Sequence, residues 1–273
     1  FSEKEAEFYK LCASKIYDWL PVAEKDEINA YFKSIAELLQ SQDDSNLKFF
    51  TFTTDICVKH SLESVSKTES YRELLDTNTT DMDFTHVDAL SRLIIILLKT
   101  FNANKSELIE KSLQGALVVL LKYHEIEQDK FNQRPFYRLF SNLLYDLCRK
   151  EYSFNLADLT SFCSLFMTAL DKIQPLKCPG FAFAWLQLIS SRYFMPIVLM
   201  NTQSKAEMWG KYSLLLGGMF RFFKEIPDAE LESSAATREL YKGTLRLLLV
   251  ILTDFPEYFI EMSSVLCEYL SDR

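Results

Sequence analysis

Residues that turn or break a polypeptide are scarce in this chain. Only 6 of its 273 residues are Gly and 7 are Pro, whereas a fold of many short strands needs turn residues every few positions. The composition therefore disfavours strand-rich folds. Hydrophobic residues make up 48% of the sequence, and they recur at spacings of three and four, which predicts amphipathic helices.

Long hydrophobic runs are also missing. The most apolar runs, 93–98 and 245–252, are far shorter than the roughly 20 residues of a membrane-spanning helix, and Arg246 interrupts the second run. We therefore expect no transmembrane segment and no membrane partner. The net charge of −8 disfavours general affinity for duplex nucleic acid, because the average surface repels phosphate.

Sequence patterns of metal sites are absent as well. No two of the six cysteines form a CxxC pair, and no HExxH motif occurs. His60, His86 and His124 lie far apart in the sequence, and Gln128 stands where a zinc helix beginning at His124 would need its second ligand. We expect structural or exposed histidines, no metal and no cofactor. The scattered cysteines are expected to be reduced thiols of a cytoplasmic or nuclear protein.

The chain also has none of the common signatures of catalysis. It contains no GxSxG turn and no recognisable pairing of a reactive Cys with a His. Gly217-Gly218 is not followed by Lys-Ser or Lys-Thr, so it is not a phosphate-binding loop, and close helix packing is its simpler explanation. We therefore expect no catalytic residues and no enzymatic activity.

The periodic segments predict an all-α fold, an irregular HEAT-like stack of antiparallel amphipathic helices. We expect a single elongated domain over 1–273, with a possible sub-boundary in the polar stretch 76–83. Because the chain opens on Phe1 rather than Met, we expect a fragment of a longer scaffold protein. Helices are expected over about 3–20, 28–39, 47–75, 85–101, 108–121, 135–147, 155–173, 181–200, 206–224, 235–253 and 257–270, with Pro196 kinking or dividing the segment 181–200.

Two stretches go beyond generic helix. Residues 178–192 read CPGFAFAWLQLISSR, and residues 241–257 read YKGTLRLLLVILTDFPE. Both resemble motifs of the C-terminal homology domain of Not-one, the large scaffold subunit of the Ccr-four-Not deadenylase complex. They occur in the family's order and spacing, with Trp209 between them. The resemblance extends more loosely over 84–273, whereas the first 75 residues match no motif of the family.

This resemblance implies a non-catalytic scaffold domain that docks the Not-two and Not-three or Not-five subunits through their extended peptide segments, with repressor peptides as further candidates. It implies a part in messenger RNA decay, deadenylation, translational repression and transcription regulation, in the cytoplasm and the nucleus. The family domain continues into a further helical section, which this chain is expected to lack. Departures from the motifs, Ser190-Ser191 in place of Ser-His and Thr253 in place of His, keep the apolar pattern.

Candidate partner-binding residues lie where the two motifs meet the prolines. Aromatic side chains beside such joints suit a groove for an extended or helical peptide, since they supply contact area at low entropic cost. Core packing is the favoured explanation for Trp185 and Phe255, with Phe181 and Trp185 facing inward, and lining a groove is the alternative; Gly243 would allow close approach of another helix. The candidates are Pro179, Phe181, Trp185, Tyr241, Lys242, Leu245, Phe255 and Pro256.

An RNA-binding helical module and a general HEAT-like adaptor remain as alternatives. Basic residues stand beside aromatic ones at 134–138 and 221–224, a combination found in single-stranded RNA sites. Two or three charges form a weak signal, so weak or no direct RNA binding is expected.

Overall fold

A computed structural model describes residues 3–22, 35, 37, 39, 45–72, 82–100, 104–148, 154–201, 203–227 and 233–271. Throughout these described ranges the regular elements are helices and no strand occurs, which confirms the predicted fold class. Of the helices expected, the one over 28–39 lies mostly outside the described residues. None of the helices in the described ranges is both long enough and apolar enough to span a membrane.

The chain divides into two compact units, Phe1–Tyr152 and Ser153–Arg273. The sub-boundary expected at 76–83 lies largely outside the described residues, and the helices before and after it belong to the same unit. The expectation of a single domain over 1–273 therefore stays a prediction.

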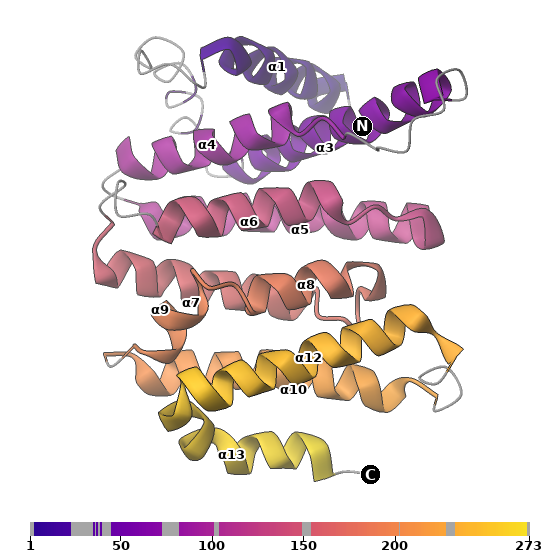
Figure 1. Ribbon diagram of the computed structural model, residues 1–273. Helices are drawn as coiled ribbons and strands as arrows, with labels where there is room; N and C mark the ends of the chain where they lie inside the picture. The colour runs from indigo at the N-terminus through magenta and orange to yellow at the C-terminus, as the bar shows by residue number, and fades with distance from the viewer. Residues whose placement is uncertain are drawn as a thin grey trace. The chain divides into compact units, whose positions relative to one another are not determined.

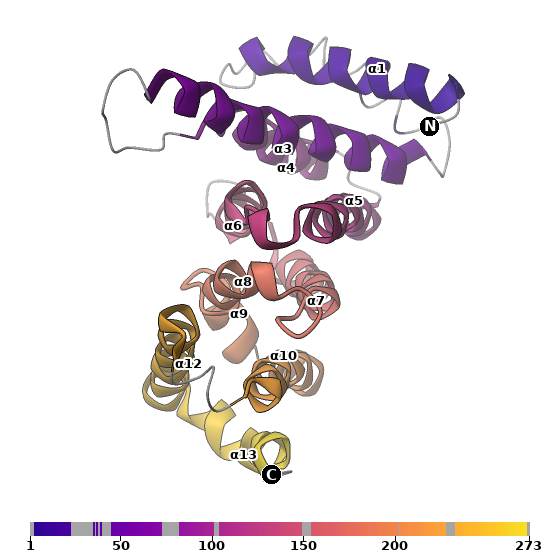
Figure 2. The same ribbon diagram turned by 90° about the vertical axis from the view of Figure 1, so that its right-hand side faces the viewer.

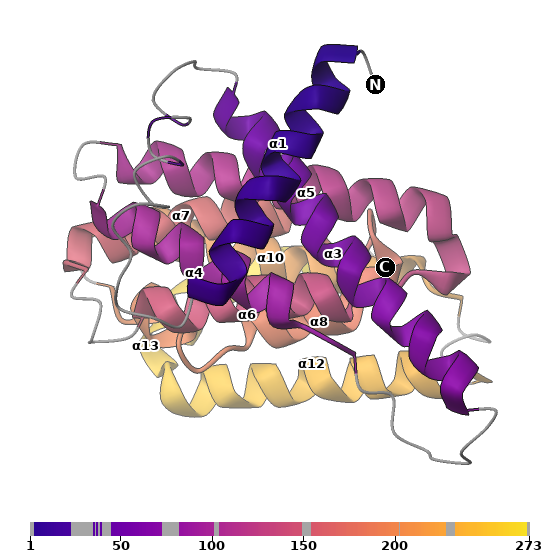
Figure 3. The same ribbon diagram turned by 90° about the horizontal axis from the view of Figure 1, so that it is seen from above.

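The first unit is a layered helical stack. In Figures 1 and 2, α3 and α4 form one layer and α5 and α6 the next, with α3 packed on α5 and α4 on α6. Figure 3 shows α1 crossing over α3, on which it packs. The helices are α1 (Glu3–Trp19), α3 (Ser45–Arg72), α4 (Thr85–Thr100), α5 (Lys105–Glu127) and α6 (Arg134–Cys148), with 3-10 turns η1 (Leu20–Val22) and η2 (Gln128–Lys130).

Buried aromatic residues join the layers of this unit. The indole Nε1 of Trp19, at the end of α1, donates a hydrogen bond of 2.8 Å to the carbonyl oxygen of Ala89 in α4. Phe136 and Phe140 of α6 are fully buried. Pro135 occupies the first turn of α6, as the sequence predicted, where its missing N–H costs no helical hydrogen bond.

The second unit is built around α10. This helix packs against α7, α9 and α13, while α12 packs against α8 and α13 (Figures 1 and 2). Asn155 caps α7 as predicted, its side chain accepting a hydrogen bond from the Asp158 N–H at 2.7 Å. The elements are α7 (Leu156–Lys172), η4 (Pro179–Phe181), α8 (Ala182–Ile189), α9 (Met195–Leu199), α10 (Lys205–Glu225), α12 (Ala235–Asp254) and α13 (Pro256–Ser271).

The segment 181–200 is divided, as predicted for a helix that contains Pro196. The break falls at 190–194, and Pro196 lies in the first turn of α9, where its ring is compatible with a helix. Gly217 lies in close helix packing, also as predicted, because a Cβ atom there would stand 2.8 Å from ring atoms of Tyr269 in α13.

Candidate docking surface

The first motif, 178–192, contributes residues to the core. Phe181 and Trp185 are completely buried, and the Trp185 Nε1 donates a hydrogen bond of 2.8 Å to the carbonyl oxygen of Leu170 in α7. A partner cannot contact side chains that the fold covers, so both residues are removed from the candidate partner surface. Pro179, at the start of η4, is exposed.

The second motif forms α12 and its joint with α13. On one side of α12, Leu240, Leu247 and Ile251 are buried, and the helix packs against α8 and α13. A Cβ atom on Gly243 would lie 2.9 Å from Cδ2 of Leu186 in α8. The close approach predicted for Gly243 is therefore confirmed.

The other side of α12 is apolar but exposed. Tyr241, Leu245, Leu249 and Leu252 follow one another at intervals of four, four and three residues, which places them on one helix face. They are 42%, 47%, 60% and 48% exposed. We call these four residues the α12 stripe. A helix that is apolar on two sides needs a second covering surface, and an exposed apolar patch of this kind is typical of an interaction site.

Three basic residues lie beside this stripe. Arg238, Lys242 and Arg246 recur at four-residue intervals on the adjacent face of α12, and all three are exposed. Lys242 Nζ lies 2.8 Å from Oε1 of Glu239, and this hydrogen bond lowers the pKa of the Glu239 carboxyl. We call Arg238, Lys242 and Arg246 the basic row. It gives one flank of the apolar stripe a positive character.

An aromatic contact holds one end of the stripe, and a buried joint residue lies at the other. The ring of Tyr241 packs edge-on against Phe223 of α10, with centroids 5.3 Å apart. Phe255 is buried, and its N–H donates to the carbonyl oxygen of Ile251 to end α12, whereas the neighbouring Pro256 is exposed and begins α13. Phe255 thus supports the joint from the core, and only Pro256 of this pair is accessible.

Sequence reasoning found part of this surface. Tyr241, Lys242 and Leu245 were candidates and come together, whereas Leu249 and Leu252 were missed. Their signal was present in the run 245–252, since both continue the helical spacing from Leu245.

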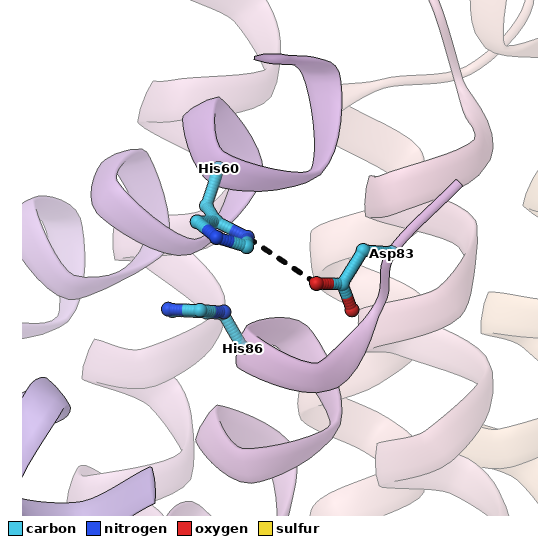
Figure 4. Close-up of side chains that lie close together, drawn as sticks. All are labelled: His60, Asp83 and His86. Carbon is cyan, nitrogen blue, oxygen red and sulfur yellow. Dashed lines mark ion pairs between the residues drawn. The ribbon is translucent and has the colours of Figure 1, made fainter. Parts of the chain in front are cut away.

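A second cluster consists of side chains from two segments that are separated in the sequence. His60 of α3, His86 in the first turn of α4 and Asp83 just before α4 point toward one another (Figure 4). The two imidazole rings are stacked, with centroids 3.6 Å apart and planes inclined by 27°. His60 Nδ1 lies 3.9 Å from Oδ2 of Asp83. The packing of α3 on α4 creates this cluster, so no local sequence pattern could have indicated it.

Three of the four imidazole nitrogens of this cluster are buried without a protein hydrogen-bond partner. Both ring nitrogens of His86 and Nδ1 of His60 are buried without one. Burial lowers the pKa of His86, the neighbouring His60 lowers it further, and Asp83 opposes the shift. Each such buried polar atom costs about 1–3 kcal/mol when it has no partner, so the cluster is suited to a group that accepts nitrogen lone pairs.

The basic residues considered for RNA make contacts within the protein. The guanidinium of Arg138 donates to both carboxylate oxygens of Asp88, at 2.7 and 2.9 Å. Arg134 and Arg138 both lie over the ring of Phe84, and Arg221 lies over Tyr269. The RNA-binding alternative stays a prediction.

The buried thiols are poorly suited to nucleophilic chemistry. Burial raises the pKa of Cys12, Cys148 and Cys178 to about 12. At neutral pH these groups are therefore protonated, and the thiol is a weak nucleophile compared with the thiolate.

The known proteins to which this chain is similar belong to one family. Residues 144–273 match the family model described as "CCR4-Not complex component, Not1". The chain is 33% identical over 265 residues to "General negative regulator of transcription subunit 1" of Saccharomyces cerevisiae, covering 89% of this chain and 12% of that protein. It is 28% identical over 255 residues to "CCR4-NOT transcription complex subunit let-711" of Caenorhabditis elegans, covering 86% and 10%. The chain thus spans only a small part of these relatives.

Solved structures share the fold. The NOT1 superfamily homology domain from Chaetomium thermophilum matches with a TM-score of 0.79 at 24% identity, over 97% of this chain and 51% of that one. A structure described as "Not1 C-terminal domain in complex with Not4" matches with a TM-score of 0.70 at 26% identity, over 92% and 50%. These similarities agree with the predicted HEAT-like stack of helices.

Proposed function

Because this chain belongs to the Not1 (Not-one) family of CCR4-Not complex components, we propose that it is a non-catalytic scaffold domain on which another subunit of that complex docks. The names of its relatives describe a regulator of transcription and a complex subunit rather than an enzyme. The observation that carries the proposal is the α12 stripe, an exposed apolar helix face with a basic flank.

The chemistry of this surface describes the partner segment. Apolar anchors would cover Leu245, Leu249 and Leu252, and Tyr241, held by Phe223, would present a rigid edge. Acidic side chains on the same segment would lie beside the basic row. The expected ligand is therefore an apolar peptide with acidic residues along one side, bound as a helix or an extended strand.

Extended segments of Not-two and of Not-three or Not-five are the first candidates, as the sequence resemblance implies. A Not4 segment is the second, since a related Not1 C-terminal domain has been solved with Not4. Repressor peptides would compete for the same surface. In this proposal the domain supports messenger RNA deadenylation, decay and translational repression, in the cytoplasm and the nucleus.

The test is calorimetric titration of the 273-residue chain with N-terminal segments of Not-two and Not-five and with a Not4 segment. Leu245→Glu places a charge in the stripe, and affinity is expected to fall at least about tenfold, because burying an unpaired charge opposes docking. Leu214→Glu is the matched control, since Leu214 lies in the same unit and is also 47% exposed. Its affinity is expected to be unchanged.

Two results distinguish the docking function itself from its assignment to the α12 stripe. If none of the segments binds the folded chain, the docking function is rejected. If a segment binds and Leu245→Glu and Leu249→Glu leave its affinity unchanged, docking stands and the α12 stripe is rejected as its site.

A further inference from the structure

We propose that His60, Asp83 and His86 form a binding site for a divalent transition-metal cation, with zinc as the expected ion. The inference is independent of the docking function, since the cluster lies in the first unit and the α12 stripe in the second. It rests on the convergence of three donor side chains from two helices and the segment that precedes one of them (Figure 4).

The donor set fits zinc. Two imidazoles and one carboxylate are ligands that zinc accepts, whereas Mg²⁺ and Ca²⁺ prefer oxygen atoms. The candidate ligand atoms of His60, Asp83 and His86 all lie within 4.8 Å of one another. Three protein ligands leave one position of a tetrahedral ion open to water, as in zinc sites that are not fully closed by protein.

Hydrogen bonds within the protein hold Asp83 in a position suited to a metal ligand. Its Oδ1 accepts a hydrogen bond of 2.8 Å from the N–H of Thr85, and its own N–H donates to Oγ of Ser64 in α3 at 3.0 Å. These contacts fix the carboxylate between the two helices and leave Oδ2 facing His60. Outer hydrogen bonds of this kind orient ligands in metal sites.

The histidines supply lone pairs that no protein donor uses. Both ring nitrogens of His86 and Nδ1 of His60 are buried without a hydrogen-bond partner. A neutral imidazole has one lone pair and one N–H, so a cation would accept one lone pair from each ring and would replace one missing contact in each. Because a bound ion would link α3 to the start of α4, it would also oppose their separation on unfolding.

The site must contract to hold an ion. Ligand atoms about 2.0–2.2 Å from a tetrahedral zinc lie roughly 3.3 Å from one another, and His60 Nδ1 and Asp83 Oδ2 are 3.9 Å apart. The stacked rings must also turn about their side-chain bonds, since their lone pairs lie in nearly parallel planes. Broad torsion preferences for the imidazole allow this rotation. Asp83 and His60 are partly exposed, which gives the ion a route of entry.

The test uses the 273-residue chain after treatment with a chelator. Zinc is titrated by calorimetry, and Co²⁺ is added as a spectroscopic substitute. One equivalent of zinc is expected to bind and to raise the thermal unfolding midpoint. His60→Gln and Asp83→Asn are each expected to weaken binding by more than about 100-fold, because even outer partners of metal ligands contribute about 10–100-fold.

Two features keep the test decisive. Asp83→Asn retains an acceptor for Thr85 and changes a partly exposed side chain, so it reports on the ligand even if His60→Gln perturbs folding. His124→Gln is the matched control from the same unit, and unchanged zinc affinity is expected, since His124 lies outside the cluster. Circular dichroism confirms that each variant is folded.

Three results would overturn the site. The first is the absence of saturable zinc binding to the folded chain. The second is binding that both His60→Gln and Asp83→Asn leave unchanged. The third is a cobalt spectrum dominated by thiolate charge transfer, which would assign the ion to cysteines instead.

Discussion

Gly115 of α5 lies directly against the backbone of Phe50 in α3. A Cβ atom on Gly115 would stand 2.8 Å from the Phe50 carbonyl carbon and 2.8 Å from the Thr51 nitrogen. Backbone atoms inside a helix cannot swing aside as a side-chain end can. The crossing of α3 and α5, which pack directly on one another, therefore requires glycine at this position.

Gly115→Ala is expected to destabilise the protein. Alanine is favoured over glycine by about 0.8–1.0 kcal/mol inside a helix, but overpacking of this kind costs about 1–3 kcal/mol. We expect a net loss in the free energy of unfolding, measured by urea titration with circular dichroism. A gain in stability would show that α5 can move away from α3 without cost.

Gly243→Ala provides the contrasting case. Its added Cβ would meet Cδ2 of Leu186, the end of a flexible side chain, at 2.9 Å. A small rotation of Leu186 relieves this contact, so the change in unfolding free energy is expected to stay below about 1 kcal/mol, within the range of the helix-propensity gain. The same urea titration compares the two alanine variants directly.

Asn155→Ala tests the cap of α7. The Asn155 side chain accepts a hydrogen bond from the Asp158 N–H, and losing an N-cap of this kind costs about 1 kcal/mol. Asn104 also precedes a helix, α5, but makes no side-chain cap bond. We therefore expect Asn104→Ala to lose less stability than Asn155→Ala in the same urea titration. Equal losses would contradict the assignment of the cap.

Trp185→Phe distinguishes a core residue from a partner contact. The substitution removes the hydrogen bond to Leu170 and leaves a void in a fully buried site, which is expected to lower stability by about 2–4 kcal/mol. At a temperature where the variant is folded, affinity for the docking segments is expected to match the unsubstituted chain. Unchanged stability together with lost affinity would show that Trp185 contacts the partner.

The fold was largely predictable because helical periodicity is local. Apolar residues three and four apart indicate one covered face, and glycine or proline marks most of the joints. Even the division of 181–200 was indicated by Pro196, although the break falls at 190–194, ahead of the proline. The proline occupies the start of a helix, where it is tolerated, and the joint forms before it.

The sites were less predictable because tertiary packing decides which apolar faces are covered. The helical pattern already favoured inward positions for Phe181 and Trp185, but it could not tell that Tyr241 and Leu245 of α12 are exposed. The pairing of His60 with His86 depends on the packing of α3 against α4. Long-range contacts of this type leave no pattern along the chain.

Thiol labelling tests the burial of the cysteines. Cys267 of α13 is exposed, whereas Cys12, Cys57, Cys163 and Cys178 are buried. At pH 8 a thiol with a pKa of about 12, as burial gives Cys12 and Cys178, is ionised in roughly one molecule in 10,000, in addition to being inaccessible. We expect rapid reaction of a disulfide reagent with Cys267, and Cys267→Ser is expected to remove this fast phase. Rapid reaction of several thiols in the folded chain would contradict the buried assignments.

Reversal of charge in the basic row tests the inferred character of the partner. Arg246→Glu lies beside the α12 stripe and alters charge without removing apolar contact area. With an acidic peptide, the association rate at low salt is expected to fall about tenfold, since long-range attraction chiefly accelerates encounter. At about 1 M salt, where the screening length is roughly 3 Å, the difference should largely disappear.

Lys172→Glu, an exposed charge at the end of α7, is the control and should leave the rate nearly unchanged. Stopped-flow measurements over a salt series provide these rates. A decrease for Arg246→Glu that persists at high salt would indicate a direct contact with Arg246, and an unchanged rate at low salt would show that the segment does not carry acidic residues along this flank.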